Sequence, residues 1–278
     1  MTNNCDDADF PPYETIAGNG QASGLLLICD HASPAIPARY DRLGLSDEQL
    51  ARHIAYDIGA RAMTVGLARA LGLPAVLSTF SRLLIDPNRG ADDPTLVMRI
   101  SDGALIAGNA RIDAAEIARR KARYYEPYHD CIDKQLAAIE ATRGGRAASI
   151  FSIHSFTPTW RGVARPWEVA ILWDADPRMP EPIIAALRAD PALTVGDNEP
   201  YDGALLNDCL YRHGTSRGRA HALIELRQDL IADQKGVDEW VQRLVPVLAG
   251  LMNDQALDAH CFYPSRTGVP LVPGDDGA

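Results

Sequence analysis

Two histidines and a glutamate stand at the ends of apolar segments that the sequence predicts to be β-strands. His31 follows GLLLICD, His154 closes ASIFSIH, and Glu225 lies in AHALIEL. Ligands of parallel sheets bind outside the carboxyl ends of the strands, so these side chains are expected to meet there. Two histidines and a carboxylate would leave one position of a zinc ion open for water. A separate carboxylate must then take the proton from that water.

A loop after another predicted strand carries two arginines and an asparagine. The segment SRLLIDPNR contains Arg82, Asn88 and Arg89. A planar guanidinium donates two parallel hydrogen bonds to a carboxylate, and a cationic donor also stabilises the oxyanion of a tetrahedral intermediate. Two clustered arginines on an acidic chain favour the binding of an anionic substrate. The alternative is that Arg82, Asp86 and Arg89 form a salt-bridged group that holds the loop.

Six segments, in this order, resemble the N-formylglutamate amidohydrolase family: LLLICDHAS, HIAYDIGA, SRLLIDPNR, IHSFTP, DNEPYDG and LIELRQDLI. That family is in turn similar to the zinc carboxypeptidases, in which an Asn-Arg pair holds a substrate carboxylate and a Glu-Leu-Arg strand supplies the general base. The resemblance implies the following roles: zinc ligands His31 and His154, general base Glu225, oxyanion stabiliser Arg82, carboxylate binding by Asn88 and Arg89, and substrate contact or support by Arg227.

The third zinc ligand does not follow directly from the resemblance. Zinc carboxypeptidases have a His-x-x-Glu pair, but the residue three positions after His31 is Pro34. We favour Asp57 in HIAYDIGA, with His53 one helical turn earlier on the same face. Asp30 and His53 are the other candidates. In the structural alternative, Asp57 pairs with His53 or Arg61 on a solvated helix face.

Other candidate residues also have a structural alternative. A buried carboxylate is costly unless it is paired, and Arg227, two residues after Glu225, could be its partner. Tyr201 in DNEPYDG is expected either to line the pocket, as a substrate-binding residue, or to belong to a simple turn. His213 is expected at the pocket mouth or at the C-terminus of a helix.

A rival motif is GTSRG, residues 214–218, which matches the G-x-S-x-G nucleophile elbow. That elbow requires a strand before it and a helix after it. Here a helical stretch comes first and a strand follows, so Ser216 is expected in a loop. A serine hydrolase using Ser216 and a non-catalytic ligand-binding protein of the same fold stay open as alternatives.

Apolar runs alternate with helical patterns along the chain, which is typical of a mainly parallel sheet covered by helices. We therefore predict one α/β domain with a mixed, mainly parallel sheet flanked by helices, similar to the zinc carboxypeptidase and phosphorylase/hydrolase architecture. Strands are predicted over residues 24–30, 75–80, 148–154, 168–173 and 220–226.

Helix signals are clear at three places. Ser46 and Gln49 form a capping box for a helix predicted over 46–71. A second helix opens at Asp113, should kink or break at Pro127, and ends near residues 144 and 145. A third helix is predicted over residues 233–252. The domain is expected over residues 24–263, after a lead-in over 1–23 and before a flexible tail over 264–278.

Composition limits the classes of function. The formal charge of −10 argues against a nucleic-acid or anionic membrane surface. No apolar run approaches the roughly 20 residues that span a bilayer, and the polar N-terminus lacks the features of a signal peptide. The five cysteines form no C-x-x-C pair, which indicates reduced thiols in the cytoplasm.

The predicted function is hydrolysis of a small amide by a cytoplasmic enzyme that binds one zinc ion per chain. The expected substrate is an anionic N-acyl amino acid, with N-formyl-L-glutamate, cleaved to formate and glutamate, as the leading case. The alternative within the same chemistry is another acyl-amino acid or a small peptide.

Overall fold

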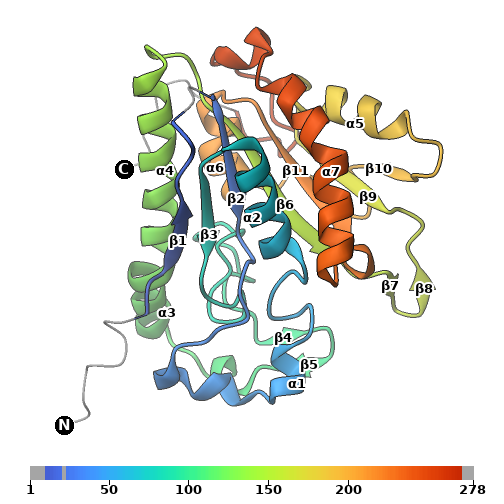
Figure 1. Ribbon diagram of the computed structural model, residues 1–278. Helices are drawn as coiled ribbons and strands as arrows, with labels where there is room; N and C mark the ends of the chain where they lie inside the picture. Colours follow the sequence, from blue (N-terminus) through green and yellow to red (C-terminus); the bar gives the residue numbers. More distant parts are fainter. Residues whose placement is uncertain (1–9, 21–22, 271–278) are drawn as a thin grey trace.

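A computed structural model of the chain describes residues 10–20 and 23–270. Its centre is a seven-stranded sheet with helices on both faces (Figure 1). The strands of this sheet are β1 (Tyr13–Ile16), β2 (Leu25–Cys29), β3 (Ala75–Ser78), β6 (Ser149–Phe156), β9 (Val169–Leu172), β10 (Val195–Asp197) and β11 (His221–Arg227). Their order across the sheet is β1-β3-β2-β6-β11-β9-β10. Two short hairpins lie outside it: β4 (Ile100–Ser101) with β5 (Ala104–Leu105), and β7 (Thr159–Trp160) with β8 (Val163–Ala164).

The central strands are covered on both faces, which explains why their sequences are apolar without alternation. β2, β3, β6 and β11 run parallel to one another. β9 and β10 run the opposite way, and β1 is antiparallel to β3. Every residue of β2, β3, β6 and β9 is buried, as expected of strands between two helical layers. The predicted mixed, mainly parallel sheet is confirmed, and all five predicted strands are present with ends shifted by at most two residues.

Two helical layers enclose the sheet. The helices are α1 (Asp47–Leu50), α2 (Ala60–Leu71), α3 (Ala114–Arg120), α4 (Glu126–Thr142), α5 (Pro180–Arg188), α6 (Cys209–His213) and α7 (Gln234–Leu251). α2, α5 and α7 pack on one face, whereas α4 and α6 pack on the other (Figure 1). Met63 and Leu67 of α2 and Leu244 of α7 are fully buried, and each such side chain stabilises the fold by about 1.5–3 kcal/mol.

The helix predicted over 46–71 is wrong in its middle. Its capping box is present, but the helix is broken into α1 and α2. Gly59 has a φ of 83°, and a Cβ there would lie 2.3 Å from the carbonyl oxygen of Ile231. This close approach in a left-handed conformation requires glycine, and α2 begins directly after it. Asp57 therefore lies in a run of turns. The prediction that it shares a helix face with His53 is wrong.

The second predicted helical stretch contains a π-helical turn close to the expected kink. The side chain of Asp113 caps α3 by accepting a hydrogen bond from the backbone N–H of Glu116. Residues Lys121–Tyr125 are π-helical and lead directly into α4. Pro127 falls in the first turn of α4, where its missing N–H costs little. The late helix is also confirmed, as α7, with Asp233 as its cap.

The segments predicted to flank the domain are partly integrated into it. β1 falls within the predicted lead-in, 1–23, and joins the sheet by pairing with β3. In the predicted tail, 264–278, the guanidinium of Arg266 lies 2.8 Å from the carboxylate of Asp202. Residues 271–278 lie outside the described part of the chain.

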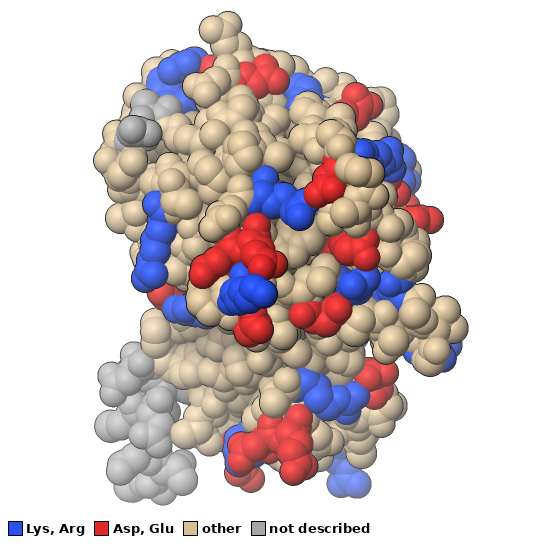
Figure 2. Space-filling model, turned by 45° about the vertical axis from the view of Figure 1, so that its right-hand side comes forward, with Lys and Arg blue, Asp and Glu red and all other residues tan. Residues whose placement is uncertain are grey.

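Charged side chains of both signs are mixed over the surface. On the face shown in Figure 2, Lys and Arg side chains lie singly or in small groups between Asp and Glu side chains. Within the described ranges, no helix combines the length and the hydrophobicity needed to cross a membrane.

Candidate active site

A cavity of about 360 Å³ opens where the carboxyl ends of β2, β6 and β11 meet. Its size suits a small molecule. Eight of the nine predicted site residues line it: His31, Asp57, Arg82, Asn88, Arg89, His154, Tyr201 and Glu225. The ninth, Arg227, is not part of the lining.

Asp57 lies between the two histidines at the base of the cavity. Its Oδ2 atom is 3.3 Å from His31 Nδ1 and 2.8 Å from His154 Nδ1. All three residues are buried, and their ligand atoms lie within 4.8 Å of one another. The structure thus brings together the two histidines that the sequence predicted and the carboxylate that we favoured as third ligand.

The outer nitrogen of each imidazole faces a second buried carboxylate. His31 Nε2 is 2.7 Å from Asp86 Oδ1, and His154 Nε2 is 3.0 Å from Asp30 Oδ2. Such carboxylate–histidine pairs fix the ring proton on the outer nitrogen and leave the inner one free for a metal. Asp30 therefore takes the outer position and Asp57 the inner one.

His53, the remaining candidate for the third ligand, is held elsewhere. It lines the cavity, but its Nε2 lies 3.6 Å from a carboxylate oxygen of Asp102. Burial lowers the pKa of His53, so the ring is neutral at neutral pH. It belongs to the wall of the cavity and not to the cluster around Asp57.

The backbone around these residues explains how the site is assembled. His31 follows β2 after one intervening residue, and the backbone N–H of Asp57 donates to the His31 carbonyl at 3.0 Å. In the β6–β11 ladder His154 is the direct partner of Glu225, so the parallel register sets the two side chains beside each other. The backbone N–H of Ser155 donates to Asp57 Oδ2 at 3.3 Å, which holds the loop carboxylate against the end of β6.

Glu225 is a buried carboxylate without a counter-ion in direct contact. The residue is 7% exposed, and among the described residues Oε2 has no hydrogen-bond partner. Burial raises the pKa of Glu225 to about 7. An unpaired carboxylate in a cavity beside two histidines has the environment of a general base or acid.

Arg227 is neither the partner of Glu225 nor a group that faces the cavity. Its Nη1 lies 3.1 Å from Glu168 Oε1 and its Nε lies 2.9 Å from Asp229 Oδ1. These two carboxylates hold the guanidinium at the end of β11, away from the cavity lining. Arg227 therefore lies outside the cavity lining, and its role as substrate contact or support stays a prediction.

The two arginines of the 81–89 loop differ in their partners. Arg82 forms an ion pair with Asp86 at 2.8 Å and lies 3.6 Å from Asp57. The ion pair between Arg82 and Asp86 that the structural alternative predicted is therefore present. Arg89 is bound through Nη1 to the carbonyl oxygen of Asn88 at 2.9 Å. No carboxylate of the described residues forms an ion pair with Arg89, so its guanidinium can receive an anionic ligand.

Two residues near the cavity were not anticipated from the sequence. Arg165 is 9% exposed and donates to the hydroxyl of Tyr201 at 2.9 Å, which fixes that ring in the cavity wall. Asp208 lines the cavity, caps α6 by accepting from the backbone N–H of Tyr211, and has a pKa that burial raises to about 7. The cap spacing before α6 was a readable signal for Asp208, whereas a single arginine in a loop gave none for Arg165.

The rival nucleophile is not in the cavity. Ser216 lies in a short 3-10 turn between α6 and β11, which confirms the reversed order of elements, and its hydroxyl donates to the carbonyl of Arg212 at 2.8 Å. His213, expected at the pocket mouth or at a helix end, is the last residue of α6 and is fully buried. The cysteines of the described part are all free thiols.

Comparison with known proteins places the chain among amide hydrolases. A family model described as N-formylglutamate amidohydrolase matches residues 23–232. A gene product of Agrobacterium tumefaciens with a crystal structure is 32% identical, with a TM-score of 0.79, over 88% of this chain and 96% of that one. The N-formylglutamate amidohydrolase of Ralstonia eutropha JMP134 is 21% identical, with a TM-score of 0.68, over 87% of this chain and 97% of that one. No curated protein matches the chain.

Proposed function

Because the chain belongs to the N-formylglutamate amidohydrolase family, we propose that it is a zinc-dependent hydrolase of small N-acyl amino acids. N-formyl-L-glutamate is the leading substrate, with formate and glutamate as products. The observation that carries this proposal is the unpaired carboxylate of Glu225 in the same cavity as His31, His154 and Asp57.

The donor set around Asp57 fits a zinc ion. Two imidazoles and one carboxylate are the ligands of many catalytic zinc sites, in which a fourth position stays open. The site also has an excess of negative charge, because the four carboxylates of Asp30, Asp57, Asp86 and Glu225 surround two histidines, and among the described residues Arg82 is the one arginine that forms ion pairs with any of them. A zinc ion held by His31, His154 and Asp57 would supply Lewis acidity, lowering the pKa of a bound water and polarising the amide carbonyl.

The remaining steps are assigned to side chains of the chain. Glu225 takes a proton from the attacking water and passes it to the leaving amine, and its raised pKa suits both transfers. Arg82 is the cationic donor that lies nearest to Asp57 in the cavity, at 3.6 Å, so it is placed to stabilise the oxyanion of the tetrahedral intermediate.

The substrate carboxylate binds to Asn88 and Arg89, at the C-terminal end of the 81–89 loop. Arg89 has no ion-pair partner among the described residues, and its neighbour Asn88 also lines the cavity. A guanidinium beside an amide offers parallel donors to a carboxylate. The hydroxyl of Tyr125 donates to the backbone carbonyl of Arg89 at 2.8 Å, which holds this recognition segment in place.

Metal removal and a substrate panel test the proposed function. Dialysis against a chelator should abolish hydrolysis of N-formyl-L-glutamate, and added zinc should restore it. In a panel that includes N-formyl-L-aspartate, N-acetyl-L-glutamate and N-formylglycine, N-formyl-L-glutamate should have the highest kcat/KM. Full activity in metal-free protein would reject the zinc mechanism, and a higher kcat/KM for another member of the panel would reassign the substrate.

Arg89→Ala should selectively weaken substrates that carry an α-carboxylate. Loss of hydrogen bonds to a charged group should lower kcat/KM for N-formyl-L-glutamate by about 10- to 100-fold, while hydrolysis of an uncharged formamide changes little. Arg227→Ala is the matched control, since its guanidinium binds Glu168 and Asp229 outside the cavity, and its kcat/KM should stay within about twofold. Equal losses on both substrates in Arg89→Ala would show that Arg89 has a structural role.

A further inference from the structure

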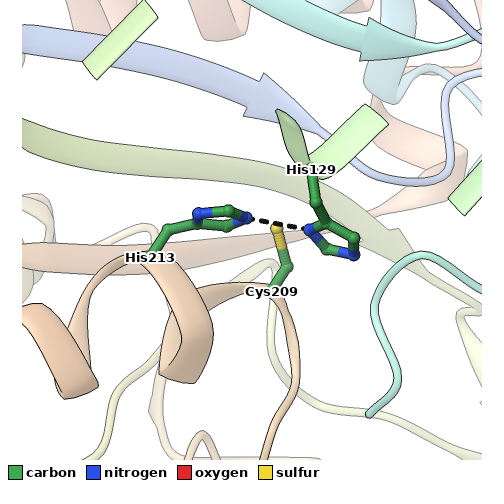
Figure 3. A group of neighbouring side chains, drawn as sticks. All are labelled: His129, Cys209 and His213. Atoms are coloured by element: carbon green, nitrogen blue, oxygen red, sulfur yellow. Dashed lines mark hydrogen bonds between the residues drawn. The ribbon is translucent and has the colours of Figure 1, made fainter. Parts of the chain in front are cut away.

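Three buried side chains outside the cavity converge between α4 and α6 (Figure 3). His129 belongs to α4, whereas Cys209 and His213 are the first and last residues of α6. All three are fully buried, and their ligand atoms lie within 4.8 Å of one another. His129 Nδ1 and His213 Nε2 are 2.8 Å apart, and the Cys209 sulfur lies beside the line that joins them (Figure 3). We refer to these residues as the His-Cys-His cluster.

The two imidazoles of the cluster are prepared as neutral ligands. His213 Nδ1 is 2.8 Å from Asp133 Oδ1, and this carboxylate keeps the ring proton on Nδ1, so Nε2 presents its lone pair to His129. Burial lowers the pKa of both histidines, well below the ordinary value for His129. A carboxylate behind a histidine is also the usual support of a zinc ligand.

Hydrogen bonding alone does not satisfy the cluster. With the proton on Nδ1, the Nε2 atom of His129 has no hydrogen-bond donor to accept from among the described residues, whereas the nearby backbone of Pro87 favours a proton on the ring. A proton on Nε2 would leave His129 Nδ1 and His213 Nε2 facing each other as two acceptors, an arrangement that a metal ion satisfies. The thiol of Cys209 faces the carboxylate of Asp30. Burial, and to a smaller extent the negative charge of Asp30, raises the pKa of this thiol well above its ordinary value. A cation at the cluster would compensate the charge of Asp30 and allow the thiol to ionise.

We propose that the His-Cys-His cluster binds a structural zinc ion, separate from the catalytic one, through His129 Nδ1, Cys209 Sγ and His213 Nε2. Binding releases the thiol proton and moves the ring proton of His129 from Nδ1 to Nε2. Zn–N bonds of about 2.0–2.1 Å at tetrahedral angles place two nitrogens about 3.3 Å apart, so the rings must separate slightly from their present 2.8 Å.

Such an ion would stabilise one wall of the cavity without touching the substrate. α6 has only five residues, and a helix of that length depends on its surroundings for stability. Asp208, which caps α6, and Leu210, within it, both line the cavity. A zinc bound by Cys209 and His213 joins both ends of α6 to His129 on α4 and therefore holds this wall against the sheet.

Cobalt(II) distinguishes the two proposed metal sites, because only the His-Cys-His cluster offers sulfur. Titration of the metal-free protein with cobalt chloride should give two bound equivalents and a thiolate-to-cobalt charge-transfer absorption in the near ultraviolet. Cys209→Ser should lose this absorption and one equivalent. Cys131→Ser is the matched control, because it removes another buried thiol, on α4, and should keep both. His154→Ala should lose the other equivalent and keep the absorption.

The outcomes separate this proposal from the catalytic one. A wild-type protein that shows no thiolate absorption in excess cobalt would overturn the structural site, whether or not the variants fold. An absorption that persists in folded Cys209→Ser would overturn it as well. One bound equivalent with the absorption would support the His-Cys-His cluster and reject the site around Asp57.

Discussion

Glu225→Gln should lower kcat/KM for N-formyl-L-glutamate by about 1000-fold or more while zinc binding is retained. The amide has nearly the shape of the carboxylate but cannot take a proton from water. Because Glu225 Oε2 has no hydrogen-bond partner among the described residues, the substitution breaks no contact that holds the cavity. Kinetics on the purified variant, together with its zinc content, would measure both effects.

A matched control is Glu168→Gln, which changes a glutamate that binds Arg227 outside the cavity lining. Its activity should remain near that of the wild type, because an exposed or half-exposed ion pair contributes little to stability. A Glu225→Gln variant as active as the wild type would show that Glu225 is not the general base. Another group would then have to take the proton from the attacking water.

The same Glu225→Gln substitution should also change how the stability of the metal-free protein depends on pH. Burial raises the pKa of Glu225 from 4.5 to about 7, so between these values the folded state binds more protons than the unfolded state. Stability associated with this carboxyl group is therefore lost as pH rises through that window. The amide side chain of the variant cannot ionise. The Tm of the variant minus that of the wild type, both metal-free, should therefore increase from pH 4.5 to 7 and then level off. A Tm difference that does not vary with pH would contradict the burial of an unpaired carboxylate.

Asp57→Asn should remove zinc from the catalytic site and abolish hydrolysis. Asp57 is the carboxylate that faces Nδ1 of both His31 and His154, so the substitution removes the negative charge of an inner ligand. The loss of zinc affinity should exceed the roughly 10- to 100-fold that follows the loss of an outer hydrogen-bond partner. Competition with a chelating dye would measure the affinity.

Asp86→Asn provides the comparison for Asp57→Asn, because Asp86 contacts His31 through the outer nitrogen, Nε2. Its zinc affinity should fall only within that 10- to 100-fold range. If both variants lost zinc to the same extent with unchanged folding, Asp57 and Asp86 would not occupy inner and outer positions.

The sheet could be predicted from sequence because its central strands are buried on both faces. Runs such as LLLIC have no polar residue and are too short for a helix, so few alternatives remain. β1 was missed because it is a short, half-exposed edge strand in a segment rich in Pro and Gly. The break between α1 and α2 was missed for a different reason. The apolar spacing continues through it, whereas the left-handed Gly59 before α2 is packed against the Ile231 carbonyl, a tertiary contact that no local spacing encodes.

The candidate site was predictable where chemistry and strand ends coincide. His31 follows a buried strand, and His154 and Glu225 lie near the carboxyl ends of two others, so topology brings all three to one edge of the sheet. The roles of Asp30 and Asp86 as outer partners depend on side-chain directions that no sequence spacing encodes. The position of Arg227 outside the cavity lining could not be predicted either, because Glu168, one of the two carboxylates that hold it, comes from a separate strand end.

The π-helical turn at Lys121–Tyr125 has a consequence for changes in chain length. It contains one residue more than an α-helical turn, so it sets the rotation of everything that follows on α4. Deleting the exposed Ala122 would therefore restore regular winding and leave Tyr128 and His129 facing Asp30 and His213, whereas adding a residue would turn them by about 100° around the axis. This stretch should therefore accept replacement of its exposed side chains and the loss of one residue, but not an insertion, which would move His129 of the His-Cys-His cluster, against whose ring Tyr125 packs.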